Sequence, residues 1–216
     1  MKRHFTYKDS VATSVNLPSL GLGCAALGNL YAEVSEADAA ATLAAAWAAG
    51  IRYFDTAPFY GHGLSEQRLG AFLRSQRDSL QVSTKVGRGL ANGETAENTG
   101  FVAAAHARPY FDYSADGVLR QVDASLVRMG RDRIDVAFVH DIGALTHGAA
   151  HAERLAERGH FGAELCVGMG VAIEAHPHEE QAGAVVVVLR CLFDVAAAFE
   201  QEARDGMHDA RAVRTG

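Results

Sequence analysis

IRYFDTAPFYGHG, residues 51–63, joins a short apolar segment to a loop that is rich in polar and aromatic side chains. We predict a β-strand over residues 51–55, because bulky residues run up to Asp55 and a loop containing proline and glycine follows. Tyr60 and His62 lie within that loop. A carboxylate at the end of a buried strand, with a phenol and an imidazole just beyond it, indicates a functional site at the carboxyl edge of a parallel sheet.

Short apolar runs alternate with helical patterns around this stretch, up to about residue 143. This alternation is typical of repeated βα units and a parallel sheet. We predict further strands at residues 20–23, 80–84 and 134–139, and helices at residues 35–50, 64–76 and 114–129. Ser35 and Ser65 are the predicted N-caps of the first two helices. Residues 88–109 show no clear period, and we predict a loop over the site there.

The composition is that of one soluble globular domain. The chain has 216 residues, a net charge of −6 and no basic block, which argues against binding to nucleic acid or to an anionic membrane. It contains no apolar run of about 18 residues and no apolar stretch of a secretory signal near Met1. We therefore expect a single domain over residues 1–216 and a cytoplasmic location. Cys24, Cys166 and Cys191 lie far apart without a CxxC pair, which favours reduced, buried thiols.

Polar residues mark the carboxyl ends of three predicted strands: Asp55, Lys85 and His140, with Tyr60 just beyond the first. Because the carboxyl ends of parallel strands lie at one edge of a sheet, we expect these four side chains to meet. An ammonium group lowers the pKa of a nearby tyrosine from about 10. Asp55 would keep Lys85 charged, and His140 could bind a substrate oxygen. His62 is expected to shape the pocket rather than to catalyse.

Such a group of side chains suits proton transfer at a carbonyl or alcohol carbon. No amino-acid side chain supplies a hydride, so a redox reaction at that carbon would require a cofactor.

The segments FDTAPFYGHGLSEQRLG, VSTKVGR and IDVAFVHDI resemble the aldo-keto reductase family, whose members are NAD(P)-dependent oxidoreductases with a (β/α)8 TIM-barrel fold. Residues 111–143 are similar to the branch that contains aldose and pyridoxal dehydrogenases. The resemblance implies that Asp55, Tyr60, Lys85 and His140 are catalytic. It also implies NADP or NAD as cofactor, with Gly23 and Asp55 as expected contacts. The implied partner is a small carbonyl or alcohol substrate, such as an aldose, pyridoxal or a similar aldehyde or sugar.

The length of the chain predicts an incomplete barrel. A closed (β/α)8 barrel usually needs about 250 residues, whereas the fourth predicted strand already ends near residue 139. The remaining residues allow two or three more βα units, so we expect about 5–6 in all, with residues 1–143 family-like and 144–216 divergent. Helices at 151–159 and 194–206 and strands at 164–171 and 184–193 are predicted there. An open barrel would expose strand edges, which favours a homo-oligomer.

Two other functions stay open at this point. The chain could be a truncated, catalytically silent scaffold that binds no cofactor, because VGMGVA stands where the family carries a Ser-Asn motif for the nicotinamide. Alternatively, GLGCAA, residues 21–26, matches the G-x-G-x-x-A fingerprint of a Rossmann-type dehydrogenase that would use Gly21 and Gly23. That fold requires a helix to begin near Cys24, whereas the next helical pattern begins at Ser35.

A metal site is not expected. HPHEE, residues 176–180, contains the ligand types His176, His178 and Glu179. The proline between the histidines and the lack of a partner motif favour a solvated loop instead.

Overall fold

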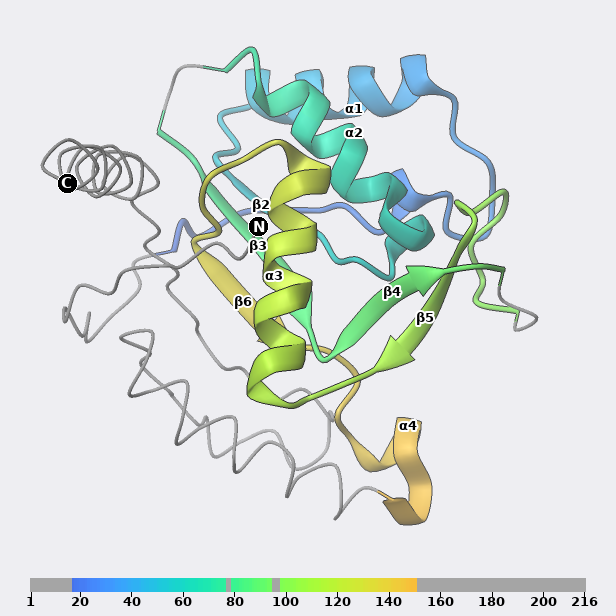
Figure 1. The fold of residues 1–216 in the computed structure, drawn as a ribbon. Helices are drawn as coiled ribbons and strands as arrows, with labels where there is room; N and C mark the ends of the chain where they lie inside the picture. The colour runs from blue at the N-terminus through green and yellow to red at the C-terminus, as the bar shows by residue number, and fades with distance from the viewer. Residues whose placement is uncertain (1–16, 77–78, 95–97, 151–216) are drawn as a thin grey trace, which may run out of the picture.

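A computed structural model describes residues 17–76, 79–94 and 98–150 of the chain (Figure 1). Four parallel strands form one sheet in the order β1-β2-β3-β6: β1 Leu22–Gly23, β2 Tyr53–Asp55, β3 Gln81–Val86 and β6 Val136–Val139. Helices α1 Glu36–Ala48, α2 Leu64–Leu73 and α3 Ala115–Met129 connect them. Short helices complete the described part: η1 Ala26–Gly28, η2 Tyr60–Gly63, α4 Ala144–His147 and η3 Gly148–Ala150. The predicted βα repeat is confirmed up to β6.

Helix capping follows the sequence in one predicted case and departs from it in another. The Ser35 side chain accepts a hydrogen bond from the Asp38 backbone N–H at 3.1 Å, as an N-cap does. Ser65 was expected to cap α2, and that prediction is wrong, because Gly63 is the N-cap and Ser65 lies inside the helix. The Ser65 hydroxyl instead donates to the Cys24 carbonyl at 2.7 Å, which ties α2 to the end of β1.

The segment predicted as a loop, residues 88–109, has a β-strand at each end, and the two strands pair as an antiparallel hairpin. Strands β4 Arg88–Asn92 and β5 Ala107–Phe111 pair with each other, from Arg88 opposite Phe111 to Asn92 opposite Ala107. Neither strand shows a period of two in its apolar residues, and Pro109 lies within β5. Antiparallel pairing of the two backbones, rather than a buried apolar face, therefore defines this hairpin.

The two faces of the parallel sheet differ in chemistry, because side chains alternate along a strand. One face is covered by the helices, as Figure 1 shows for α3 in front of β3 and β6. Its buried apolar core comprises residues of the strands and of the three helices, among them Leu43, Phe54, Leu69, Val82, Val86, Val118, Val122, Met129 and Ala137. The opposite face carries polar side chains near the carboxyl ends of β2 and β3.

A buried ion pair joins α2 to α3 on the helix-covered face of the sheet. Glu66 is fully buried and accepts hydrogen bonds from Thr84 at 2.7 Å and from Arg128 at 2.5 Å. Gly70 allows the two helices to approach, because a Cβ there would lie 2.2 Å from the Met129 carbonyl oxygen. Arg128 therefore neutralises the Glu66 carboxylate, which the contact between the helices removes from water.

The described residues contradict the Rossmann interpretation. A single 3-10 turn, η1, follows β1, and the first α-helix begins at Glu36. No α-helix therefore begins near Cys24 to form a dinucleotide-binding turn with Gly21 and Gly23. Cys24 is buried, as predicted, and burial is the main reason that its pKa rises to about 12.

Several predictions fall outside the described residues, namely the elements expected after residue 150, Cys166, Cys191 and the HPHEE segment. Among the described helices, none has the length and apolar character that a membrane span requires.

The Glu66–Arg128 pair predicts a large effect of removing one partner. Arg128→Met leaves a fully buried carboxylate without its cation, so the free energy of unfolding should fall by about 3–5 kcal/mol. Urea denaturation followed by circular dichroism measures this change. Arg120→Met is the matched control, because the ion pair of Arg120 with Asp112 is exposed at the arginine, and it should cost less than about 1 kcal/mol. Equal losses in the two variants would contradict the prediction.

Candidate active site

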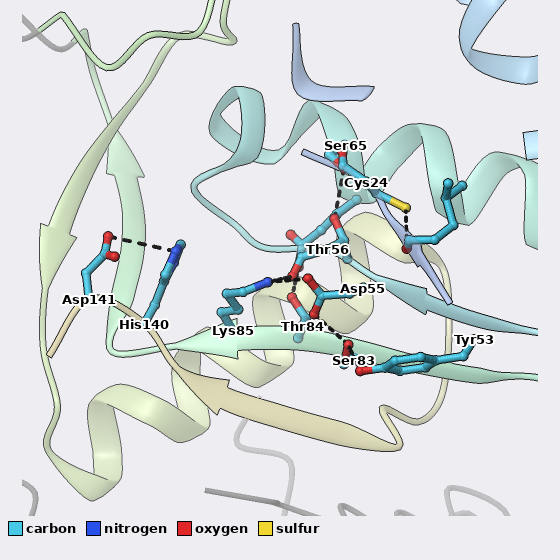
Figure 2. A network of polar contacts seen from close by, with 12 residues as sticks. Cys24, Tyr53, Asp55, Thr56, Ser65, Ser83, Thr84, Lys85, His140 and Asp141 are labelled. Carbon is cyan, nitrogen blue, oxygen red and sulfur yellow. Dashed lines mark hydrogen bonds and ion pairs between the residues drawn. The ribbon is translucent and has the colours of Figure 1, made fainter. Parts of the chain in front are cut away.

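Asp55 and Lys85 form an ion pair on the polar face of the sheet. Asp55 lies opposite Ser83 in the parallel register of β2 and β3, and Lys85 follows two residues later on the same face. Lys85 Nζ donates to Asp55 Oδ2 at 2.6 Å and to the Thr56 carbonyl at 3.0 Å. Ser83 Oγ donates to the other carboxylate oxygen, Asp55 Oδ1, at 2.6 Å and hydrogen-bonds the Tyr53 hydroxyl at 2.9 Å. Figure 2 shows Lys85 turned toward Asp55 and Thr56 within this network.

The surroundings of Lys85 favour its charged form. Burial is the largest single influence and would lower the pKa of the ammonium group. The charges of Asp55 and Tyr60 and hydrogen bonds to both outweigh burial, so the pKa of Lys85 lies above its ordinary value. Lys85 is therefore an ammonium ion at neutral pH, although its side chain is only 14% exposed.

Tyr60 begins the 3-10 turn η2, which follows β2. Its ring centroid lies 4.7 Å from Lys85 Nζ, so the ammonium group faces the phenol ring. The turn is held against η1, because a Cβ at Gly61 would lie 2.5 Å from the Gly28 carbonyl oxygen, and Gly61 has a φ of 64°. This close backbone contact fixes the position of Tyr60 next to Lys85.

His140 follows β6 and lies beside Tyr60. The backbone N–H of His140 donates to the Val86 carbonyl at 2.8 Å. The rings of His140 and Tyr60 meet edge to face, with their centroids 6.0 Å apart. Burial is the main reason that the pKa of His140 falls from 6.5 to about 4, so the imidazole is neutral at pH 7. Its buried Nδ1 has no hydrogen-bond partner within the part of the chain that the structure describes.

The structure thus brings together the four residues that the sequence singled out. Asp55, Lys85, Tyr60 and His140 come from three strand ends and one turn, and they surround one point at the carboxyl edge of the sheet. Such an arrangement can hold a charged amine against a phenol and can present a neutral imidazole next to that phenol.

A polar pocket lies next to this group. It has a volume of about 270 Å³ and is lined by residues that include His62, Thr99 and Phe101. The buried His62 hydrogen-bonds Thr99 at 3.2 Å, and the Phe101 ring centroid lies 6.1 Å from that of Tyr60. This location agrees with the interpretation of His62 as a residue that shapes the pocket.

Gly23 and Asp55, the expected cofactor contacts, lie opposite each other on β1 and β2. A Cβ at Gly23 would meet no atom within 4 Å, so the described part of the chain leaves open space there. This space lies beside Asp55, because Gly23 and Asp55 are paired across the two strands. None of the described residues form a cluster of metal-ligand types.

Sequence reasoning missed Arg88, Phe59 and Asp141, which surround His140. Arg88 Cζ lies 3.3 Å above the centroid of the Phe59 ring, and Arg88 forms an ion pair with Asp141. Both charged residues stand within the quoted segments VSTKVGR and IDVAFVHDI. Because 53 residues separate them, no local pattern reveals that they pair.

The chain is similar to proteins of one family along most of its length. A sequence model of the aldo/keto reductase family matches residues 19–206. The chain is 46% identical over 150 residues to pyridoxal 4-dehydrogenase from Microbacterium luteolum, which covers 64% of this chain and 44% of that protein. It is 43% identical over 139 residues to D-threo-aldose 1-dehydrogenase from a Pseudomonas species, which covers 61% of this chain and 42% of that protein. The chain therefore spans less than half the length of these relatives.

A solved structure shows the same fold. Aldo-keto reductase AKR11C1 from Bacillus halodurans, in its holo form, is 26% identical and has a TM-score of 0.51, with 76% of this chain and 47% of that chain covered. The fold is thus of the (β/α)8 TIM-barrel type, and its described part comprises the four parallel strands β1, β2, β3 and β6. Together with the family match over residues 19–206, this likeness identifies the chain as a member of the aldo/keto reductase family.

Proposed function

We propose that this chain carries the catalytic residues of an NAD(P)-dependent oxidoreductase that interconverts a carbonyl and an alcohol. The observation that carries the proposal is the Lys85 ammonium group, which is bound by Asp55 at 2.6 Å and lies 4.7 Å from the centroid of the Tyr60 ring. The proposed substrates are small aldehydes and sugars. The two dehydrogenases that resemble the chain, which are named for pyridoxal and for D-threo-aldose, support this class.

Tyr60 is the proposed general acid and base. In the direction of reduction, its hydroxyl donates a proton to the carbonyl oxygen of the substrate, and in oxidation the phenolate accepts the proton of the alcohol. The neighbouring Lys85 ammonium faces the ring of this phenol. Asp55 has a positioning role, because its carboxylate holds the ammonium in place and keeps it protonated.

His140 is the proposed ligand of the substrate oxygen. A neutral imidazole presents one nitrogen with a proton and one without. The buried Nδ1 has no partner among the described residues, and the imidazole ring lies edge to face against the Tyr60 ring. An imidazole that donates to the carbonyl oxygen would place that oxygen near the Tyr60 hydroxyl and polarise the carbonyl.

A nicotinamide cofactor, NADP or NAD, would supply the hydride in this reaction. Gly23 and Asp55 are the proposed contacts, because open space above Gly23 borders the Asp55–Lys85 pair. Asp55 and Lys85 would then face both the cofactor and the phenol.

We also propose a single domain over residues 1–216, a cytoplasmic location and a homo-oligomer, which are the expectations that length and composition support.

Tyr60→Phe tests the role of the phenol. This variant keeps the ring near Lys85 and removes the proton that the reaction needs, so turnover of a small aldehyde should fall by about 100-fold or more. Absorbance at 340 nm measures turnover, and NADPH fluorescence measures cofactor binding, which should change little. Tyr31→Phe is the matched control at an exposed tyrosine and should keep full turnover. An unaltered rate in Tyr60→Phe would exclude this mechanism, and no cofactor binding by the unsubstituted chain would support the silent scaffold.

His140 predicts a pH-dependent stability. Its pKa is about 4 in the folded chain and 6.5 ordinarily, so between these values the unfolded chain binds a proton that the folded chain does not. The free energy of unfolding should therefore be highest above pH 6.5 and should fall toward pH 4, with up to about 3 kcal/mol of that loss due to His140. Urea denaturation at stepped pH should give a flatter curve for His140→Gln. A curve as steep as that of the unsubstituted chain would contradict the prediction, and His106→Gln provides an exposed control.

A further inference from the structure

Arg88 contacts the surroundings of His140 from the hairpin. It is the first residue of β4. Its guanidinium group lies over the Phe59 ring, with Cζ 3.3 Å from the ring centroid. Arg88 Nη1 donates to Asp141 Oδ2 at 2.5 Å. The side chains of Arg88 and Asp141 are 15% and 32% exposed, so water screens this ion pair less than a surface pair.

The same carboxylate oxygen lies near the imidazole. Asp141 Oδ2 is 3.8 Å from His140 Nε2, which is beyond hydrogen-bond length but close enough for a small rotation to close the gap (Figure 2). The backbone beneath is fixed, because the Tyr113 hydroxyl contacts the carbonyl oxygens of His140 at 3.0 Å and of Asp141 at 3.1 Å. One anchored carboxylate therefore lies between two possible partners, Arg88 and His140.

Guanidinium and imidazole compete unequally for that oxygen. A guanidinium group presents several N–H donors and a full positive charge, whereas a neutral imidazole offers at most one N–H. Without Arg88, the Asp141 carboxylate would lose the cation that binds it and would still lie next to His140. It would accept a hydrogen bond from Nε2–H, and its charge would stabilise the imidazolium. Either change would take hydrogen-bonding capacity away from a substrate.

We propose that Arg88 is a positioning residue of the candidate active site, which binds the Asp141 carboxylate and thereby keeps it off His140. The imidazole then stays neutral and available for a substrate oxygen. The benefit to turnover rests on the proposed function, whereas the effect on the imidazole does not.

The charges around His140 agree in direction with this role. Within the described part of the chain, its charged and titratable neighbours include Asp141, Lys85, Arg88, Asp55 and Tyr60, and the Tyr113 hydroxyl donates to its backbone carbonyl. Burial is the main cause of its lowered pKa, and Lys85 and Arg88 lower that pKa further, whereas Asp141 and Asp55 raise it. Loss of Arg88 would remove one lowering charge and release one raising charge, and both changes act upward.

Arg88→Met tests the proposal directly. Methionine keeps an apolar chain against Phe59 and removes the guanidinium. The pKa of His140, followed by NMR in ¹⁵N-histidine-labelled full-length chain, should rise by about 1 unit or more. The ¹⁵N shifts should also move toward the tautomer that carries its proton on Nε2. His140→Gln identifies the signal by its disappearance, and Arg120→Met, which breaks an exposed ion pair elsewhere, should leave the titration unchanged.

A double variant separates positioning from general disruption. In Arg88→Met/Asp141→Asn the competing carboxylate is absent, so the pKa of His140 should return to within about 0.5 unit of its value in the unsubstituted chain. A pKa that stays high in the double variant would overturn the proposal. So would an unchanged pKa in a folded Arg88→Met variant.

Turnover gives a second readout. The acidic limb of the kcat/KM profile should move to higher pH in Arg88→Met and should return in the double variant, because substrate needs neutral His140. A chain without turnover would refute the proposed function and leave the titration result standing. If circular dichroism shows that Arg88→Met is unfolded, Asp141→Asn alone decides: the pKa of His140 should fall or stay, and a rise would overturn the proposal.

Discussion

The ion pair between Asp55 and Lys85 is the contact on which the candidate site depends. A lysine as buried as Lys85 would tend to lose its proton, and a carboxylate 2.6 Å away prevents this. Parallel pairing of β2 with β3 supplies the distance, because it sets Asp55 opposite Ser83 and leaves Lys85 two residues further on. Ser83 occupies the second carboxylate oxygen, so Asp55 has a fixed orientation before any ligand binds.

The alternation of side chains in β3 couples this site to the core. Lys85 points to the polar face, whereas its neighbour Thr84 donates to Glu66 on the helix-covered face. A shift of one residue in the register of β3 would exchange these faces, placing the ammonium among the helices and the hydroxyl in the site. The buried Glu66–Arg128 pair therefore does more than join two helices, since Glu66 gives the helix-covered face of β3 a polar partner that only the native register satisfies.

Local signals allowed prediction of the repeat and of the proximity of Asp55, Tyr60, Lys85 and His140, but interactions between other distant segments were not predictable. Helix α1 could be placed because Ser35 is an N-cap residue that is followed by acids in the first turn. The hairpin at Arg88 could not, because its strands pair through their backbones across residues that show no apolar period. Ser65 was misassigned for a related reason: its hydroxyl bonds the carbonyl of Cys24, a contact that exists only once β1 and α2 have packed together.

The charges around the site follow one arrangement, in which each carboxylate is bound by a cation. Asp55 holds Lys85, and Asp141 holds Arg88, at 2.6 and 2.5 Å. The phenol of Tyr60 and the imidazole of His140 then lie between these two ion pairs, and their rings meet edge to face. A carboxylate free to reach either group would hydrogen-bond it and take up the capacity that a substrate oxygen needs. Pairing the acids with lysine and arginine therefore preserves the two groups whose protons a carbonyl reaction would use.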